Sequence, residues 1–212
     1  MFDHCARIAA DGLKKFKALG RVFFAIVALS VTSQAAQIDF GFGGQWSALT
    51  YSSTSVSTST KYRGAGGTVE LRLRTMPFEK SRFGIDYFGN YTDSFLANVN
   101  HSAQEQNRAT SYGGGMDLTY NVLFIGVQYE VFTSKISAAG YHATLNYRQK
   151  EVRAGFNFPM SDKWTMSLTG MYGLSAVLLP VNSQFVNRDV EEMRGTLLFC
   201  YRFIKIGKKG RY

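Results

Sequence analysis

The feature that most constrains this chain is a two-residue alternation of apolar and polar side chains, which is clearest in residues 193–203. Leu197 and Phe203 fall on one face of this segment, and Arg194 and Arg202 fall on the other. Successive side chains of a β-strand point to opposite faces. The period therefore predicts a strand that lies between an apolar and a polar environment.

Seven further segments show the same alternation. Each extends over about ten or more residues, whereas strands of soluble proteins usually have about five or six. A tilted strand needs about 9–11 residues to cross a membrane. The lengths therefore favour membrane-crossing strands. These segments are approximately residues 38–50, 62–75, 83–91, 110–120, 123–132, 143–158 and 164–176.

The connections between these segments alternate in length. Outer-membrane barrels have short turns on the periplasmic side and longer loops on the outer side. An even number of strands then returns the C-terminus to the periplasmic side. The expected long loops are residues 51–61, 96–108, 133–142 and 179–190, and the expected short turns are residues 76–81, 120–121 and 159–163.

The surrounding lipid determines what happens at the two edges of such a sheet. Lipid offers no hydrogen-bond partner to an open sheet edge, so the sheet must close on itself. Eight strands leave an interior that side chains can fill. The sequence thus predicts an all-β, eight-stranded antiparallel up-and-down transmembrane β-barrel with a filled polar lumen. A periplasmic lipocalin-like barrel or β-sandwich is the soluble alternative, although its segments should be shorter.

The polar faces predict ion pairs inside this barrel. Arginine suits a buried site because its fork binds carboxylates bidentately and stays charged. Acids and arginines occur in equal number on these faces. The expected lumen ion pairs involve Glu70, Asp86, Asp117, Glu130, Glu151 and Glu192 with Arg72, Arg74, Arg82, Arg153, Arg194 and Arg202.

The apolar faces predict a lipid-facing wall with aromatic residues at its margins. Tyr and Trp favour the two membrane–water interfaces, where a ring can be apolar on one side and polar on the other. The expected membrane girdles contain Phe40, Trp46, Tyr91, Tyr112, Tyr120, Trp164, Tyr201 and Phe203.

The N-terminal region has the pattern of a cleaved signal peptide. Basic residues such as Lys14 and Arg21 precede an apolar stretch at 22–31, which is too short for a transmembrane helix. Small residues at Ser33 and Ala35 predict cleavage after residue 35 or 36. We therefore expect a signal peptide at 1–35, a barrel at 37–206 and a short basic tail at 207–212.

Charge and cysteine content argue against a nucleic-acid-binding protein and against a disulfide-stabilised domain. The formal net charge is +9, but much of the excess lies in the leader and the tail. Basic and acidic residues are nearly equal in number between the leader and the tail, so no basic surface for binding nucleic acid is expected. Loss of the leader with Cys5 leaves Cys200 as the single cysteine, so no intramolecular disulfide is expected.

The mature chain resembles the small eight-stranded outer-membrane barrels of the OmpA/OmpX type. Phe199, Tyr201 and Phe203 resemble the C-terminal signal that the barrel-assembly machinery reads in such proteins. The resemblance implies a monomer in the outer membrane of a Gram-negative bacterium. The sequence departs from the family pattern because residues 204–212 follow the terminal aromatic. We expect this tail to be solvated, with contact to anionic headgroups as the alternative.

Some outer-membrane barrels modify lipid A, so two weak catalytic candidates were considered. His142, Thr144 and Glu151 are similar to the His, Ser and Glu arrangement of lipid A deacylases, with Thr in place of Ser. Asp93, Ser94 and His101 are similar to the Asp-Ser and His group of palmitoyl-transferase barrels. The scattered histidines predict no metal site, and we expect no cofactor.

The sequence therefore favours a non-enzymatic outer-membrane barrel with a structural or surface-interaction role through its four outer loops. A lipid A-modifying enzyme, either a deacylase or an acyltransferase, is the first alternative, and a narrow pore is the second. The expected partners are outer-membrane lipid, the barrel-assembly machinery and a surface ligand at the loops.

Overall fold

The structure is a computed structural model, which describes residues 35–53, 59–76, 82–99, 105–138, 141–178 and 188–207. The expected signal peptide, apart from Ala35, lies outside these ranges, as do the tail beyond Gly207 and His101. Within the described ranges no helix is long and apolar enough to cross a membrane. The strands are β1 (Ala35–Ser53), β2 (Ser59–Met76), β3 (Phe83–Asn98), β4 (Gln106–Tyr120), β5 (Leu123–Ala138), β6 (Tyr141–Pro159), β7 (Trp164–Leu178) and β8 (Arg188–Gly207).

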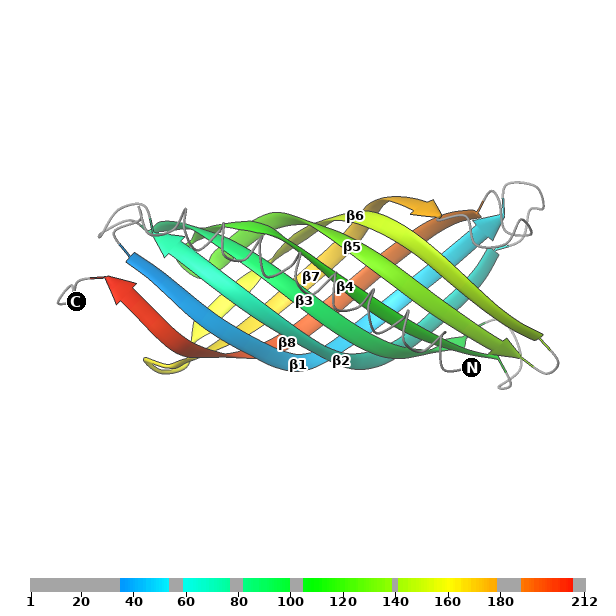
Figure 1. Cartoon of the computed structure of the whole chain (residues 1–212), viewed down its shortest axis with the longest axis horizontal. Helices are drawn as coiled ribbons and strands as arrows, with labels where there is room; N and C mark the ends of the chain where they lie inside the picture. The colour runs from blue at the N-terminus through cyan, green and yellow to red at the C-terminus, as the bar shows by residue number, and fades with distance from the viewer. Residues whose placement is uncertain are drawn as a thin grey trace, which may run out of the picture.

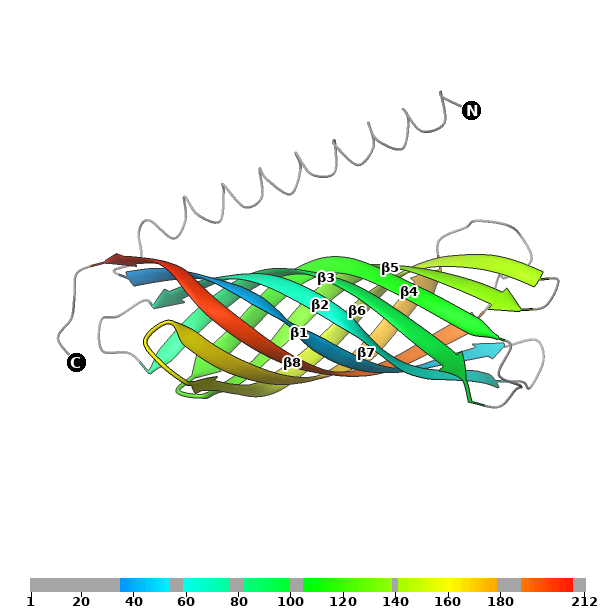
Figure 2. The ribbon, with the colours of Figure 1, turned by 90° about the horizontal axis from the view of Figure 1, so that it is seen from below.

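These eight strands form one closed barrel in which each strand pairs antiparallel with its neighbours in the chain (Figure 1). Antiparallel pairing of β1 with β8 closes the sheet, so that Phe40 lies opposite Tyr201. Ala35 and Gly207 are partners at one end of the barrel, which we call the terminal end (Figure 2). We call the opposite end the far end. The predicted eight-stranded antiparallel barrel is confirmed.

The strands are longer than a membrane crossing requires. They have from 15 residues in β4 and β7 to 20 in β8, whereas about 9–11 are enough. Most of the extra length is at the far end, where long loops were expected, and β1 and β8 also extend at the terminal end. The prediction of a loop at 133–142 was wrong, because β5 continues to Ala138 and β6 begins at Tyr141. The other three expected loops also begin or end as strand.

A β-bulge in β7 changes which face its last residues occupy. Lys150 of β6 pairs with Ser175, but the next residue, Glu151, pairs with Gly173. Leu174 is therefore the extra residue of the bulge, and its side chain is exposed. A bulge shifts the alternation by one residue. Ala176, which the alternation alone places on the outer face, instead packs against the lumen cluster at the far end.

Candidate functional site

The lumen is filled by side chains in two layers of opposite character. Charged and polar residues occupy the terminal and middle parts, and apolar residues occupy the far end. On β5, for example, Gln128 and Glu130 precede Phe132 and Ile136, and all four are buried. The chemistry of the lumen therefore changes within a few residues along each strand.

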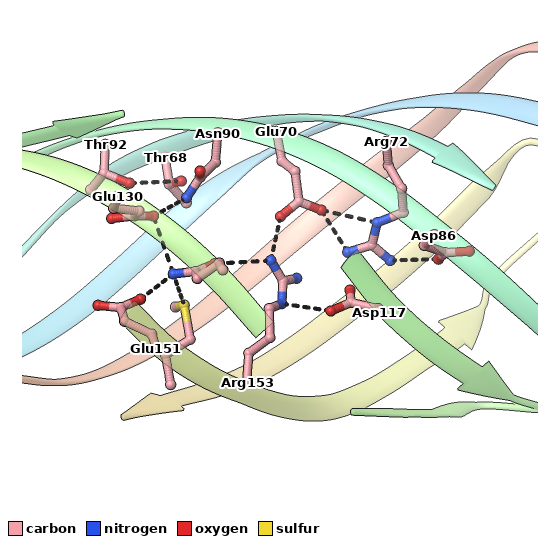
Figure 3. Close-up of polar contacts among 12 residues, drawn as sticks. Thr68, Glu70, Arg72, Asp86, Asn90, Thr92, Asp117, Glu130, Glu151 and Arg153 are labelled. Carbon is pink, nitrogen blue, oxygen red and sulfur yellow. Dashed lines mark hydrogen bonds and ion pairs between the residues drawn. The ribbon is translucent and has the colours of Figure 1, made fainter. Parts of the chain in front are cut away.

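Arg72 is central to the terminal half of the charged layer (Figure 3). Its Nη2 is 2.6 Å from Glu70 Oε1, and its Nη1 is 3.6 Å from Asp86 Oδ2. Arg74 binds the same Asp86 through Nε at 2.9 Å and Nη2 at 2.8 Å. Because the carboxylate of Asp86 is shared between two guanidinium groups, the pairs form one connected network.

Arg153 extends this network across the lumen. Its Nη1 is 3.1 Å from Glu70 Oε2, and its Nε is 3.2 Å from Asp117 Oδ1 (Figure 3). Its Cζ lies 3.8 Å from the ring centroid of Phe88 and 5.4 Å from that of Phe124. Carboxylates at its edge and aromatic rings near its face satisfy both binding modes of a guanidinium group. This arrangement holds the Arg153 side chain in one position.

Gln128 connects Arg153 to a second group of acids. Arg153 Nη1 donates to Gln128 Oε1 at 3.4 Å. Gln128 Nε2 donates in turn to Glu130 Oε1 at 3.2 Å and to Glu151 (Figure 3). The alternation of β5 places Gln128 on the inward face, but a search restricted to ion pairs misses this amide.

Three carboxylates converge on Arg194. Its Nη1 is 2.9 Å from Glu130 Oε2, its Nη2 binds Glu151, and its Nε is 3.5 Å from Glu192 Oε1. The guanidinium group and all three acids are buried. A single buried cation therefore compensates three acids. Replacement of Arg194 by an uncharged residue is expected to destabilise the barrel.

Arg202 and Asp39 form the last pair, at the terminal end. Arg202 Nε is 4.0 Å from Asp39 Oδ1, and Gln37 Nε2 donates to both carboxylate oxygens of Asp39 at 2.7 and 2.6 Å. Asp39 was not among the expected lumen ion pairs, although its position in the alternation places it inward. Arg82 was expected in the lumen, but its side chain is exposed at the bend that precedes β3. Arg82 is therefore not a lumen residue.

The far end of the lumen is closed by a cluster that we call the apolar plug. Its side chains come from seven of the eight strands, so they meet across the lumen. The plug consists of Leu49, Tyr51, Tyr62, Leu96, Ala109, Phe132, Ile136, Leu145, Tyr147 and Val190, with Ala143 and Ala176 packed against it.

Aromatic rings hold the plug together. Phe132 stacks on Tyr147 with ring centroids 4.7 Å apart, and Tyr51 contacts Tyr147 edge-on at 6.4 Å. The Tyr51 hydroxyl donates to Ser134 Oγ at 2.9 Å, and Ser134 Oγ donates to Asn107 Oδ1 at 2.7 Å. The Tyr51 hydroxyl is thus satisfied inside the lumen, whereas the buried Tyr147 hydroxyl has no hydrogen-bond partner among the described residues.

The outer wall changes character at the same level as the lumen. On β5, Ile125 and Val127 are exposed nearer the terminal end, whereas Lys135 and Ser137 are exposed nearer the far end. On β5 the wall is therefore apolar around the charged layer and polar around the plug. This reversal places the edge of the lipid-facing band between Tyr129 and Lys135 on β5.

No protein-family model and no curated protein matches the chain. Among solved structures, the outer-membrane protein AlkL, determined by solid-state NMR in DMPC lipid bilayers, aligns with a TM-score of 0.50 at 8% identity. The alignment covers 85% of this chain and 94% of AlkL. This chain is an eight-stranded outer-membrane-type β-barrel.

Two further solved structures align with the chain at lower scores. Ail, the attachment invasion locus protein of Yersinia pestis, aligns with a TM-score of 0.46 at 14% identity, covering 81% of this chain and 99% of Ail. Neisserial surface protein A aligns with a TM-score of 0.43 at 12% identity, covering 77% of this chain and 95% of that protein.

Aromatic side chains lie at both margins of the apolar band, as in other outer-membrane-type barrels. Tyr112 and Tyr120 are both exposed on β4. Their separation of eight residues corresponds to about 27 Å along the strand, and to about 20 Å along the axis at a tilt of ~40°. Of the expected girdle residues, Trp46, Tyr91 and Tyr112 lie nearer the far end, and Phe40, Tyr120, Trp164, Tyr201 and Phe203 nearer the terminal end. Tyr129 and Tyr172, which were not among the expected girdle residues, are also exposed.

The barrel separates the residues of the first catalytic candidate. His142 and Thr144 are exposed on the outer wall of β6, where His142 Nδ1 is 3.3 Å from Ser137 Oγ. Glu151 is buried in the lumen beside Arg194. Residues an odd number of positions apart on a regular strand face opposite sides. His142 and Glu151 therefore cannot form one triad.

The second candidate is divided in the same way. Asp93 pairs with Arg108 on the outer wall at 2.5 Å, whereas Ser94 is buried in the lumen near Gln45. The third member, His101, lies outside the described residues. Across the described part of the chain, no group of three or more His, Cys, Asp or Glu side chains could hold a metal ion.

Proposed function

We propose that this protein is a non-enzymatic, non-conducting barrel of the outer membrane, with a structural or surface-interaction role. The single observation that carries the proposal is the apolar plug above a charged layer, since the two layers together obstruct the lumen. A barrel that conducted ions would need a continuous polar path, and burial of ten apolar residues at the far end opposes one.

The orientation follows from the two ends. The terminal end carries Ala35 and Gly207, and an exported chain of this class keeps both barrel termini in the periplasm. The far end then projects from the outer leaflet as a rigid sleeve with an apolar interior. This sleeve would hold the outer connections in fixed positions for a surface partner.

The outer wall of the sleeve suits the phosphate groups of outer-leaflet lipid. Arg108 and Lys135 are direct cross-strand partners, and Arg148 and Lys150 are exposed on the adjacent strand, β6. Like charges directly opposite each other are unfavourable, and Asp93 compensates Arg108 alone. Lys150 lies opposite the girdle residue Tyr129. The basic patch thus begins where headgroups of the leaflet would lie, and anionic lipid would supply its counterions.

Phe199, Tyr201 and Phe203 are the proposed contact with the barrel-assembly machinery. They belong to the closing strand β8, and the ring of Phe203 packs 6.2 Å from that of Phe40 across the β1–β8 seam. The exposed side chain of Phe203 and the half-buried side chain of Tyr201 at the terminal end would be accessible to periplasmic factors before insertion.

The lumen proposal is tested by conductance. The refolded full-length mature chain in planar bilayers should show no steady current. Replacing two plug rings together, Tyr51→Ala and Tyr147→Ala, should produce transient openings, because these rings cross the far end. Tyr112→Ala on the outer wall is the matched control and should remain silent. A large steady current through the unaltered protein would overturn the proposal.

The enzyme alternative has its own test. Lipid A from cells producing the protein should have the same mass spectrum with His142→Ala, and separately with His101→Ala, as with the unaltered chain. A lipid A species that depends on either histidine would replace the non-enzymatic proposal.

A further inference from the structure

A cavity of about 530 Å³ opens at the terminal end of the barrel. Volumes of this size are typical of small-ligand pockets. Two guanidinium groups, two amides and a hydroxyl line it, and no carboxylate does. The lining residues are Arg74, Asn121, Val122, Asn157, Pro159, Thr165 and Arg202.

Asn157 lines this cavity and carries an unpaired donor. Arg72 Nη1 donates to Asn157 Oδ1 at 3.0 Å. Because a guanidinium group can only donate, the amide oxygen must face Arg72, and the amide nitrogen must face away from it. Asn157 Nδ2 is buried and has no hydrogen-bond partner within the described structure. A buried amide nitrogen without an acceptor is unfavourable, so it marks the place of a missing acceptor.

The two arginines are held by groups that do not line the cavity. Arg74 is bound by Asp86 at 2.8 Å, and Arg202 Nη1 donates to the backbone carbonyl of Asp162 at 2.6 Å. Arg202 Nε is buried and has no hydrogen-bond partner among the described residues, while Asp39 lies 4.0 Å away. The guanidinium groups are therefore fixed in position before any ligand arrives, which lowers the entropic cost of binding.

We propose that this cavity binds an oxyanion, either a phosphate or a carboxylate group, that enters from the terminal end. Such a group accepts a hydrogen bond from Asn157 Nδ2 and gains attraction from the guanidinium groups of Arg74 and Arg202. The site goes beyond the proposed function, because it lies at the opposite end of the barrel from the plug. In the outer membrane this end faces the periplasm. The oxyanion could then belong to a soluble periplasmic molecule or to a phospholipid headgroup of the inner leaflet.

The test is a titration of the refolded full-length mature chain in uncharged detergent micelles, followed by NMR of side-chain N–H groups. Inorganic phosphate, and separately acetate, should produce saturable shifts of Asn157 Nδ2 and Arg202 Nε. Asn157→Asp keeps the acceptor for Arg72 but replaces the donor with a negative oxygen, and should weaken binding at least tenfold. Arg202→Gln should also weaken it. Arg63→Gln, on the exposed outer wall near the far end, should have no effect.

Micelles doped with phosphatidylglycerol distinguish the two sources. Saturation without added phosphate in these micelles supports a lipid headgroup, whereas saturation only with soluble anions supports a periplasmic ligand. A heat-modifiable gel shift first establishes that each variant is folded. Shifts that never saturate, or that are equal in the unaltered protein and in Asn157→Asp, would overturn the site.

Discussion

Arg194 lies against the ring of Phe132, with its Cζ 5.1 Å from the ring centroid. This contact joins the two layers of the lumen, because Arg194 gathers the acids of the charged layer and Phe132 belongs to the plug. A cation that has lost its water benefits from the face of an aromatic ring. The boundary between the layers is therefore a direct contact and requires no intervening water.

Removing the Arg194 charge should be severely destabilising. Arg194→Met leaves three buried carboxylates without their cation, and loss of one partner from a buried pair typically costs about 3–5 kcal/mol. Urea unfolding in lipid vesicles measures the change. Arg108→Met, which breaks an exposed pair, should cost at most about 1 kcal/mol.

A second variant separates charge from packing at this position. Adding Glu151→Gln to Arg194→Met should restore part of the lost stability, because it removes one uncompensated acid. No recovery would mean that the Arg194 side chain matters for its shape rather than for its charge.

The position of the lipid-facing band can be tested with two lysines on one strand. Val127→Lys introduces a charge near the middle of the apolar wall, opposite Met116, and should cost about 2–4 kcal/mol in a bilayer. Thr133→Lys lies beyond the band on the same face of β5 and should cost about 0–1 kcal/mol. Unfolding in vesicles provides both values, and equal costs would contradict the proposed band edge.

The close packing of the lumen predicts opposite outcomes for two glycines. A Cβ on Gly155 would lie 2.0 Å from the Leu168 carbonyl oxygen and 2.7 Å from Phe124 Cζ. Gly155→Ala should therefore destabilise the barrel by about 1–3 kcal/mol. A Cβ on Gly67 meets no atom within 4 Å, so Gly67→Ala should change stability by no more than about 0.5 kcal/mol or increase it slightly. Thermal unfolding compares the pair.

The basic patch on the outer wall predicts a dependence on lipid charge. The unaltered protein should be more stable in vesicles with anionic lipid than in zwitterionic ones, by up to about 1 kcal/mol for each lysine near the surface. Lys135→Glu with Lys150→Glu should remove most of this difference. Lys163→Glu, in the exposed turn at the terminal end, should leave the far-end contribution intact. A lipid-charge effect that survives the double change would place the interaction elsewhere.

Much of the charged layer could be predicted because a regular strand fixes the direction of every second side chain. Glu70 and Arg72 are on one face of β2 in the sequence, and both are buried in the lumen. Which acid meets which arginine could not be predicted. Arg153 reaches Glu70 from a strand 83 residues away, and that contact depends on how the strands are staggered around the barrel.

The plug was missed for a different reason. Residues 133–142 look like a polar loop because the outward positions change from apolar to polar there, while the inward positions change from polar to apolar. The alternation persists, but its two faces exchange their character. A pattern that requires apolar outward residues and polar inward residues therefore ends β5 too early and begins β6 too late.

The sequence by itself determined the eight strands, their antiparallel order and the face to which most side chains point, because a period of two is a local property of extended backbone. The tertiary structure alone decided which environment each face meets. Toward the far end, the outward side chains of β5 become polar and its inward side chains become apolar. One bulge in β7 moves Ala176 into the lumen. Both outcomes depend on contacts between distant strands, which local alternation does not encode.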